Sequence, residues 1–297
     1  MSTQVLYLSQ IRTVLRNTDI ERIDPAEGQF NDIVMINKEW VFRFPRYREG
    51  VARLINETRL LEALRGRLPL PIPDPIYQVF EPPVPGLAFM GYHLLPGEPF
   101  IRAALDQVSS EWVRDDLASQ LARFLRSMHA MPLDELEGLV PDFLRPADGR
   151  AEWEVMYAQA REKLFPAMRP DARRQVSEHF EAYLDDSSLH SFNPCLRHGD
   201  FGGSNILWDS AQGKITAVID FSFCALGDPA ADLASISTLG EDFFSRLVSL
   251  YELNDARRAA LLARARFYRG TFALQEALAG LRDNNRNAYQ SGMEEYV

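Results

Sequence analysis

The residues of this sequence best suited to chemistry lie in one polar stretch, RHGDFGGSNILWD, at residues 197–209. Asp200 and Asn205 stand in it, directly ahead of an apolar run. The residues that follow, ILWDSAQGKITAVIDF, predict two short strands with a tight turn, and strands joined this tightly pair antiparallel as a hairpin. The start of the first strand then lies beside the end of the second. We therefore expect Asn205 next to Asp220, with Asp200 in the loop just before the hairpin.

Two carboxylates and an amide at one end of a hairpin suit phosphoryl transfer. Mg²⁺ favours oxygen ligands, keeps several waters and accepts phosphate oxygens, and Asn205 and Asp220 would supply two such ligands. The separate carboxylate of Asp200 would take a proton from a hydroxyl group. A metal on the phosphates and a base on the acceptor are the parts of a phosphoryl-transfer site. The alternative is an Asx-rich turn in front of a hairpin, with no chemistry.

The motifs of this region follow one another in a specific order. They are His198-Gly199-Asp200 with Asn205, then Ile219-Asp220-Phe221, then Gly227-Asp228-Pro229 with Asp232-Leu233. This run resembles the protein-kinase-like small-molecule phosphotransferases, and among them the aminoglycoside phosphotransferases of the 2″ type. The resemblance implies an α+β fold of two lobes, a small N-terminal antiparallel-sheet lobe and a larger helical C-terminal lobe.

The resemblance also implies a role for each motif residue. Asp200 is similar to the catalytic base, and Asn205 and Asp220 to the Mg²⁺ ligands. His198 is expected to shape the loop rather than to act as an acid or base. Asp228 and Asp232 are expected to hold the loop after the metal aspartate.

On the nucleotide side, the family pattern places a phosphate-binding lysine on a strand and a glutamate partner on the next helix. This chain has Arg43 at the lysine position, in VFRFPR, and Glu57 at the glutamate position. The guanidinium is larger and planar and binds phosphate as a fork. Arginine also stands there in relatives such as macrolide kinases. The alternative for Arg43 is an ordinary surface charge on a strand.

The rest of the nucleotide site is expected at a short loop and at a hinge. Gly28, in GQFND, is similar to the loop of the antibiotic kinases, and the absence of GxxxxGK[ST] excludes a P-loop NTPase. In MGYHLLPG the backbone groups of His93 and Leu95 would hold the purine of ATP or GTP. Tyr92 would guard the back of the base pocket. It resembles the aromatic residue of 2″-type enzymes that accept GTP, or it is an ordinary hinge residue that leaves ATP use intact.

Residue patterns predict which elements carry these groups. Apolar periodicity predicts helices at 2–17 and 49–66, and two strands around Asn37-Lys38. Further helices are expected at 113–128, 151–165, 171–184, 240–251 and 255–281. The predicted division is 1–91 for the nucleotide-binding lobe, 92–97 for the hinge and 98–297 for the helical lobe, with the catalytic loop at 197–233.

The overall charge narrows the partners. The 297 residues carry a formal net charge of −10, which disfavours nucleic acid and anionic lipid and suits a small cationic acceptor. The alternative is that the acidic balance merely keeps a cytosolic protein soluble. The sequence shows neither a membrane span nor a signal peptide. Cys195 and Cys224 are read as reduced thiols, so we expect a cytoplasmic protein, a monomer or a weak dimer.

The acceptor remains open at this stage. Glu241 and Asp242 follow the GDPAADLA segment, where 2″-type enzymes are similar to this chain and hold the ammonium groups of the drug. The alternative is a helix N-terminus whose dipole favours acids. Glu276 is a weaker candidate. The first hypothesis is an aminoglycoside kinase, and the second is a kinase for a macrolide, choline, homoserine or a sugar. A nucleotide-binding pseudoenzyme is disfavoured because all three motif residues are present.

Overall fold

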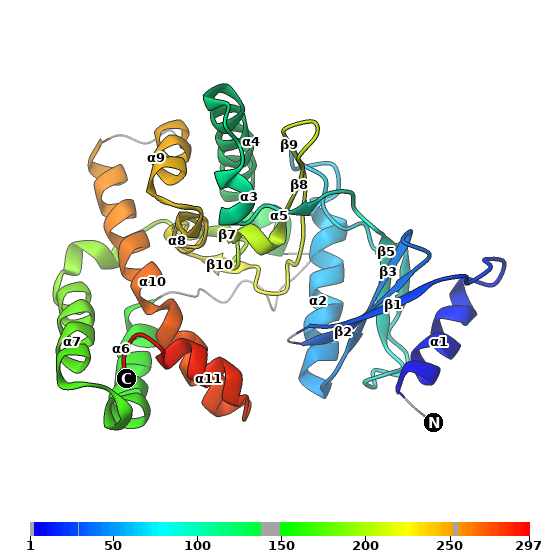
Figure 1. Cartoon of the computed structure of the whole chain (residues 1–297), viewed down its shortest axis with the longest axis horizontal. Helices are drawn as coiled ribbons and strands as arrows, with labels where there is room; N and C mark the ends of the chain where they lie inside the picture. The colour runs from blue at the N-terminus through cyan, green and yellow to red at the C-terminus, as the bar shows by residue number, and fades with distance from the viewer. Residues whose placement is uncertain (1–2, 29, 138–148, 252–254) are drawn as a thin grey trace.

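The structure is a computed structural model that describes residues 3–28, 30–137, 149–251 and 255–297. Two parts lie side by side along its long axis (Figure 1). The first is an antiparallel sheet with two helices, and the second is a larger assembly of helices with short strands. This is the protein-kinase-like α+β architecture that the sequence predicts. None of the helices in the described ranges is long and apolar enough to cross a membrane.

The sheet of the first part has five strands in the order β1-β2-β3-β5-β4, and each neighbouring pair is antiparallel. The strands are β1 (Ile23–Glu27), β2 (Asn31–Ile36), β3 (Trp40–Pro45), β4 (Tyr77–Val79) and β5 (Phe89–His93). Asn37 and Lys38 have φ angles of 54° and 53°, the left-handed geometry that a two-residue hairpin turn requires. The predicted hairpin is therefore confirmed. β1 was missed because Pro25 argues against a strand, although an edge strand tolerates proline.

The alternation of β3 decides what each face of the sheet meets. Trp40, Phe42 and Phe44 belong to a core cluster with α1 (Thr3–Val14), and the rings of Tyr7 and Phe44 stack at 4.1 Å. Successive side chains of a strand point to opposite faces. Arg43 therefore points to the other face, which α2 (Arg48–Leu64) covers (Figure 1).

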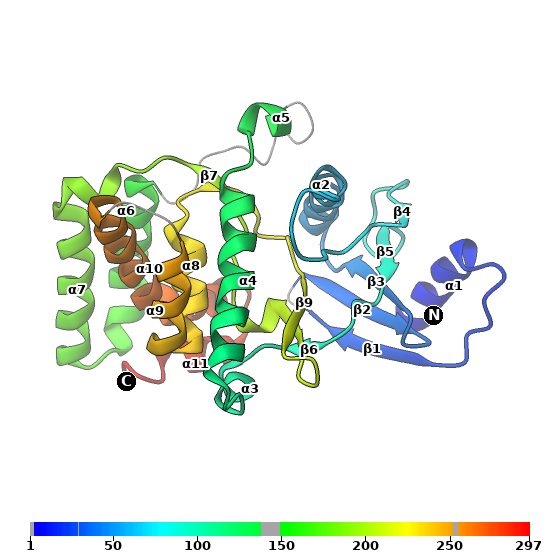
Figure 2. The same ribbon diagram turned by 90° about the horizontal axis from the view of Figure 1, so that it is seen from above.

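The second part contains the predicted helices and several short elements that the sequence did not indicate. Its helices are α3 (Arg102–Asp106), α4 (Glu111–His129), α5 (Leu133–Glu137), α6 (Arg150–Gln159), α7 (Pro170–Asp185), α8 (Ala230–Ile236), α9 (Glu241–Leu250), α10 (Asp255–Arg282) and α11 (Arg286–Met293). Short helical turns are η2 (Ala160–Leu164), η3 (Phe165–Ala167), η4 (Ser187–His190), η5 (Gly203–Asn205) and η6 (Ser237–Leu239). Figure 2 shows α4, α9 and α10 beside α8, viewed from above.

Its short strands form two small sheets near the first part. They are β6 (Glu98–Pro99), β7 (Cys195–Arg197), β8 (Ile206–Asp209), β9 (Lys214–Val218) and β10 (Ala225–Gly227). β6 pairs with β8 and β8 with β9, while β7 pairs with β10. Pairing of β6 with β8 joins the segment after β5 to the hairpin.

The division of the chain at residues 91 and 97 stays a prediction.

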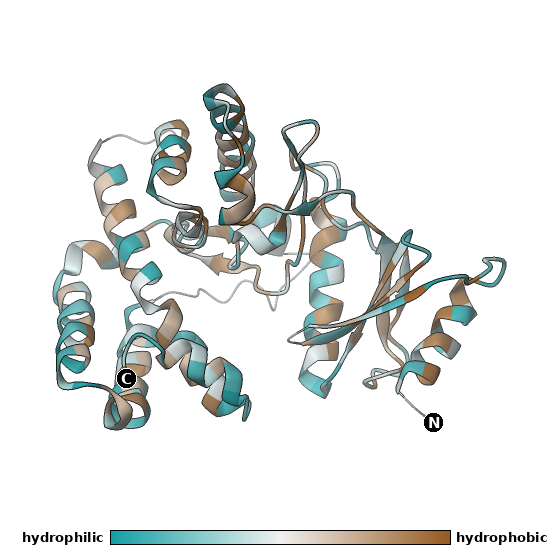
Figure 3. Cartoon of the chain, in the orientation of Figure 1, coloured by the Kyte–Doolittle hydropathy of each residue, from teal (hydrophilic) through white to brown (hydrophobic). Residues whose placement is uncertain are grey.

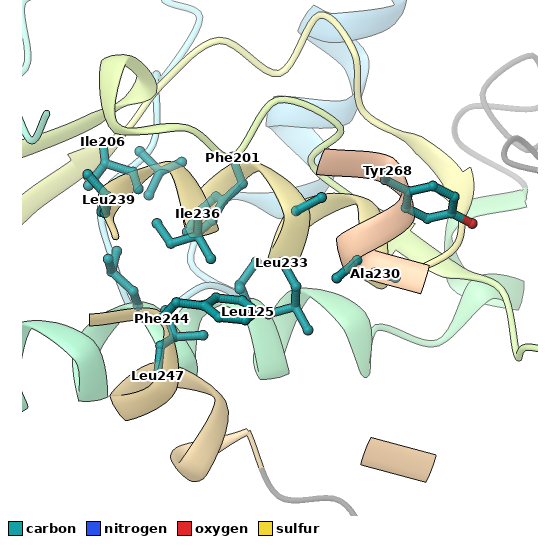
Figure 4. Packing of buried hydrophobic residues seen from close by; sticks show 14 of the residues in the cluster. Leu125, Phe201, Ile206, Ala230, Leu233, Ile236, Leu239, Phe244, Leu247 and Tyr268 are labelled. Atoms are coloured by element: carbon teal, nitrogen blue, oxygen red, sulfur yellow. The ribbon is translucent and has the colours of Figure 1, made fainter. Parts of the chain in front are cut away.

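The core of the second part is built around α8. Figure 4 shows Leu233 and Ile236 packed against Leu125 of α4 and Leu247 of α9, with Phe201 among them. Along the ribbons of the surrounding helices, apolar and hydrophilic residues alternate, as amphipathic helices require (Figure 3). Because Phe201 directly follows Asp200, this core anchors the loop that carries the candidate base.

A buried charged network joins the start of α8 to α10. Asp228 accepts from Arg264 through two bonds, Nε to Oδ2 at 2.5 Å and Nη2 to Oδ1 at 3.1 Å. It also accepts from the Tyr268 hydroxyl at 2.7 Å and from the Ala230 N–H at 3.0 Å. The side chains of the ion pair are 0% and 6% exposed. Removing one partner would leave a buried charge uncompensated.

We expect Arg264→Met to lower the free energy of unfolding by about 3–5 kcal/mol, because it removes the guanidinium that donates two bonds to the buried Asp228 carboxylate. Denaturant unfolding followed by circular dichroism measures this. Arg266→Met is the matched control, since Arg266 is exposed on the same helix and surface changes cost less than about 0.5 kcal/mol. Equal stability of the two variants would contradict the assigned role.

Candidate active site

The hairpin predicted from the sequence positions two of the three candidate residues. Ile206 of β8 lies opposite Val218 of β9, and the Ile219 N–H donates to the Asn205 carbonyl at 2.9 Å. Asn205 and Asp220 therefore lie at the same end of the hairpin, as the sequence predicted.

The loop before the hairpin folds Asp200 onto Asn205. The Asn205 amide Nδ2 donates to the Asp200 carbonyl at 2.9 Å and to its Oδ2 at 2.8 Å. A Cβ at Gly203 would lie 2.4 Å from the carbonyl oxygen of Phe100, so the close approach of the loop requires glycine. Both bonds use the amide nitrogen, which leaves Oδ1 of Asn205 as the atom to offer a cation.

The backbone and carboxylate of Asp220 are both constrained. Its φ is 61°, a left-handed geometry that is uncommon outside glycine. Its Oδ1 accepts from the Ser222 hydroxyl at 2.7 Å, from the Ser222 N–H at 3.4 Å and from Arg43 Nη2 at 3.3 Å. With Oδ1 held in this way, Oδ2 is the oxygen that Asp220 offers to a metal.

Arg43 and Glu57 form the buried pair expected for a nucleotide site. Arg43 Nη1 donates to Glu57 Oε1 at 2.6 Å, and the two side chains are 6% and 1% exposed. Glu57 Oε1 also accepts from the Phe221 N–H at 3.2 Å. Burial by itself lowers the pKa of Arg43, but the charges of Glu57 and Asp220 raise it above its ordinary value. Arg43 is therefore a buried cation between the two parts of the molecule and not a surface charge.

His198 ties the loop to the second strand of the hairpin. Its ring is buried, and Nε2 lies 3.1 Å from the Ile219 carbonyl. Because a carbonyl only accepts, Nε2 carries the proton and Nδ1 accepts from the Asp200 N–H at 3.3 Å. This geometry supports the loop-shaping role that the sequence indicated.

Asp232 supports the same loop from below. Its two oxygens accept from the His198 N–H at 2.8 Å and from the Gly199 N–H at 2.7 Å, and His129 Nε2 lies 2.9 Å from Oδ2. Burial by itself raises the pKa of Asp232, but the bonds and charges of these groups hold it below its ordinary value. The carboxylate is therefore an ionised acceptor fixed under the loop.

The structure differs here from the expectation that Asp228 and Asp232 both hold the loop after the metal aspartate. Asp232 lies in the first turn of α8, where its oxygens reach the N–H groups that precede Asp200. Asp228 anchors the start of α8 to Arg264. The sequence contains both carboxylates, but it does not show against which strand end α8 packs, and this packing decides which loop each carboxylate supports.

The two candidate carboxylates differ in basicity. Burial raises the pKa of Asp200 above its ordinary value; His198 and the bond from Asn205 lower it by less, and the charges of Asp220 and Asp232 add to the rise. For Asp220 burial also raises the pKa, but Arg43 and the bonds from Ser222 outweigh it and hold the pKa below its ordinary value. Asp200 is thus the better proton acceptor, and Asp220 is the better metal ligand.

The donor set fits Mg²⁺ shared with a substrate. No group of three histidine, cysteine or acidic side chains that could hold a metal occurs in the described part of the chain. Asn205 and Asp220 instead offer two oxygens at one hairpin end. Mg²⁺ is commonly bound by one or two protein carboxylates plus waters and substrate phosphates.

A cavity of about 1670 Å³ lies beside Asp200. One wall comes from Gly28, Phe30 and α2, and the other from α10 and α11. Its carboxylates are Glu49, Asp200, Glu276 and Asp283, its arginines Arg46, Arg53, Arg282 and Arg286, and its amides Gln275, Asn284, Asn285 and Asn287. The cavity is therefore polar on both walls and large enough for a sizeable acceptor.

The structure does not bring the expected acceptor residues, Glu241 and Asp242, to this cavity. Asp242 is exposed at the start of α9 and bonds to Arg246 Nε at 3.1 Å, with Arg114 Nη1 at 3.7 Å. The Arg114 contact joins α9 to α4, as does the bond from Arg246 Nη1 to Asp115 Oδ1 at 2.6 Å, which accounts for Asp242 without a ligand. Glu276, the weaker candidate of the sequence, does line the cavity.

The hinge residues lie at the end of β5. Tyr92 is buried on the face of the sheet that also carries Arg43. The Leu94 N–H donates to the Glu39 backbone carbonyl at 2.7 Å, which turns it toward β3. Because successive residues of a strand alternate, the backbone groups of His93 and Leu95 turn to the opposite edge of β5, away from β3. β4 pairs only with residues up to Gly91 on that edge. The geometry thus supports a base-binding role for this hinge, which stays a prediction.

Sequence reasoning missed Ser222 and the corner between α10 and α11. Ser222 stands two residues after Asp220, a spacing at which hydroxyls and carboxylates commonly bond within a turn. The corner, RDNNRN at 282–287, is a polar run between two helical patterns, and it lines the far wall of the cavity. Both signals were in the sequence, but neither shows which site it serves.

Comparison with known proteins shows the family to which the chain belongs. The model of the phosphotransferase enzyme family matches residues 23–268. Viomycin phosphotransferase of Streptomyces vinaceus is 32% identical over 280 residues, which cover 91% of this chain and 91% of that protein. The uncharacterised protein YcbJ of Bacillus subtilis is 26% identical over 72% of this chain and 67% of its own length.

Solved structures share the fold. The GDP and kanamycin complex of APH(2″)-IIIa superposes with a TM-score of 0.87 at 24% identity, covering 97% of this chain and 96% of that chain. Macrolide 2′-phosphotransferase type I has a TM-score of 0.75 at 20% identity, covering 100% of this chain and 98% of that chain.

Ser222→Ala should weaken Mg²⁺ binding about tenfold, because groups that orient a metal ligand typically contribute 10- to 100-fold in affinity. The readout is the rise in melting temperature as Mg²⁺ is titrated onto the protein with nucleotide present. Ser237→Ala is the control, since its hydroxyl bonds only to the Ala234 carbonyl. An unchanged Mg²⁺ titration in Ser222→Ala would remove its role at Asp220.

Proposed function

The chain belongs to the phosphotransferase enzyme family and is a small-molecule kinase, and we propose that it moves the γ-phosphoryl group of ATP or GTP to a hydroxyl of a cationic antibiotic. One observation carries this proposal. The carboxylate of Asp200 lies 2.8 Å from the Asn205 amide, while Asn205 and Asp220 stand at the same end of the adjoining hairpin. A base and a metal pair are thereby separate but adjacent, as transfer to a hydroxyl requires.

Each residue has a role that its contacts support. Asp200 has Oδ2 engaged by Asn205, so Oδ1 accepts the proton of the acceptor hydroxyl. Arg43, charged and fixed by Glu57 and Asp220, directs its remaining N–H groups to the donor phosphates. Mg²⁺ bound by Asn205 and Asp220 supplies positive charge to the transferring phosphates. Gly28 brings the nucleotide loop to the edge of the cavity.

The cavity is lined by as many arginines as carboxylates, so its partners for ammonium and hydroxyl groups are individual carboxylates and amides rather than its overall charge. Carboxylates and amides occur on both sides of Asp200, among them Glu276 of α10 and Asn284 at the α10–α11 corner. A macrolide would prefer a wide apolar pocket with fewer acids. We therefore place an aminoglycoside first and keep choline, homoserine, a sugar and a macrolide as alternatives.

A second acceptor has a specific observation behind it. The relative at 32% identity is named for viomycin, whereas the structure of APH(2″)-IIIa with GDP and kanamycin is 24% identical. Viomycin therefore belongs in the acceptor panel beside kanamycin and gentamicin. Release of nucleoside diphosphate with viomycin alone would replace the aminoglycoside proposal without changing the assigned chemistry.

The donor follows from the region around Tyr92. A buried aromatic side chain on the face of the sheet that carries Arg43 narrows the back of the base site. We propose that GTP is accepted, alongside or in preference to ATP. Comparing kcat/KM for the two nucleotides tests this, and a clear ATP preference would reject it.

Asp200→Asn should lower kcat by about 10²- to 10⁴-fold, the usual contribution of a positioned base. Nucleotide affinity should change little, since Asp200 does not contact Arg43 or Glu57 in this structure. The measurement is diphosphate release with Mg²⁺ and each acceptor of the panel, using ATP and GTP separately. Near-normal turnover by Asp200→Asn would exclude it as the base.

Glu276→Gln should raise the KM of a cationic acceptor about three- to tenfold, because it removes a charged partner of an ammonium group. The KM of the nucleotide should stay the same. Glu241→Gln is the matched control, since Glu241 lies outside the cavity. A larger effect in Glu241→Gln than in Glu276→Gln would move the acceptor to the start of α9, as the sequence first indicated.

A further inference from the structure

Three side chains from separate segments meet at the edge of the cavity, and we refer to Phe30, Arg53 and Phe223 as the clasp. The rings of Phe30 and Phe223 lie edge to face, with centroids 5.5 Å apart. The Arg53 guanidinium lies over both rings, 4.8 Å from the Phe30 centroid and 5.6 Å from the Phe223 centroid. All three line the cavity beside Asp200.

The backbone of each phenylalanine is held in place. The Phe30 carbonyl accepts from the Arg46 N–H at 3.0 Å, which ties the nucleotide loop to the end of β3. The Phe223 carbonyl lies so close to Gly199 that a Cβ there would approach it to 2.2 Å. Gly199 has a φ of 84°, so glycine is required twice over. The position of Phe30 is therefore fixed to that of the nucleotide loop, and the position of Phe223 is fixed to that of the catalytic loop.

The Arg53 side chain could pair with a carboxylate on its own helix, but it contacts the rings of Phe30 and Phe223 instead. Glu49 precedes it by four residues on α2, the spacing of a helical ion pair. Across the described ranges, no carboxylate lies in ion-pair contact with Arg53. A guanidinium over two aromatic faces gains cation–π attraction from both.

The clasp also makes a second attachment of α2 to the segment after Asp220. Glu57, one turn after Arg53, accepts from the Phe221 N–H at 3.2 Å. Arg53 contacts Phe223 two residues further on. The same helix therefore holds this segment at both ends, and through Phe30 it holds the nucleotide loop as well.

Packing of the core does not require these contacts. Phe223 is 36% exposed, and Arg53 is exposed on α2. Phe223 is a partly exposed aromatic side chain that lies beside the candidate base and contacts residues of the other part of the chain. We therefore expect it to contribute more to the geometry of the site than to the stability of the fold.

We propose that the clasp positions the nucleotide loop against the segment that carries Asp220, so that donor phosphates and metal ligands are aligned together. The proposal rests on the proposed phosphoryl transfer. Phe30, Arg53 and Phe223 are positioning residues, since none of them supplies a metal ligand or the base.

A double-mutant cycle of Phe30→Ala and Phe223→Ala tests the clasp, with the Kd of Mg²⁺·GDP and Mg²⁺·ADP as readout. This readout needs no acceptor. Each single change should weaken binding about three- to tenfold, the range of an aromatic or cation–π contact. The double variant should be no weaker than about the worse single, because both changes remove one shared contact. A double effect equal to the product of the singles would overturn the proposal.

Controls separate the clasp from folding and from the proposed function. Trp112→Ala removes an aromatic side chain that is 75% exposed and outside the cavity, so its Kd should match the unmodified protein. Melting temperatures of all variants should agree within a few degrees, and a loss of nucleotide binding that follows a loss of stability would reject the clasp. Absence of nucleotide binding in the unmodified protein would reject the proposed function itself. Binding with an additive cycle would reject the clasp alone.

Discussion

The geometry of the candidate site depends on one buried carboxylate. Asp232 is 0% exposed and accepts the N–H groups of His198 and Gly199 directly before Asp200. These N–H groups have no strand partner at this point, and a buried unpaired N–H is costly. His129 fixes Asp232 in turn. Asp232 of α8 therefore fixes the backbone of this loop. The position of the Asp200 oxygens is set by the core of the helical part rather than by the loop itself.

Arg43 provides the corresponding link to the sheet. Its guanidinium bonds to Glu57 on α2 and to Asp220 after β9, so one side chain joins elements far apart in the sequence. A lysine has a single charged nitrogen with no fork, whereas a planar fork serves both carboxylates at once. The arginine at this position is therefore compatible with the site. Ser222 completes the arrangement by holding the same oxygen of Asp220.

The sequence was sufficient for local relations and insufficient for long-range ones. The hairpin, and with it the meeting of Asn205 and Asp220, followed from two strands joined by a short turn. The alternation of β3 likewise fixed that Arg43 faces away from Trp40. The position of Asp242 did not follow, because its role depends on whether α9 packs toward α4 or toward the cavity. In the structure Arg114 of α4 lies 3.7 Å from Asp242, and Arg246 of α9 bonds to Asp115 of α4.

The sequence by itself thus predicted the chemistry: a candidate base, two candidate metal ligands and the pairing of Arg43 with Glu57, in an order that resembles one family. The tertiary structure alone decided which walls enclose the acceptor and which carboxylate supports which loop. The physical reason is range. Strand pairing and side-chain alternation act over a few residues, and a pattern of residue types records them. The packing of α8, α10 and α11 depends on contacts between distant segments, and these place Asp232 under the loop and Glu276 in the cavity wall.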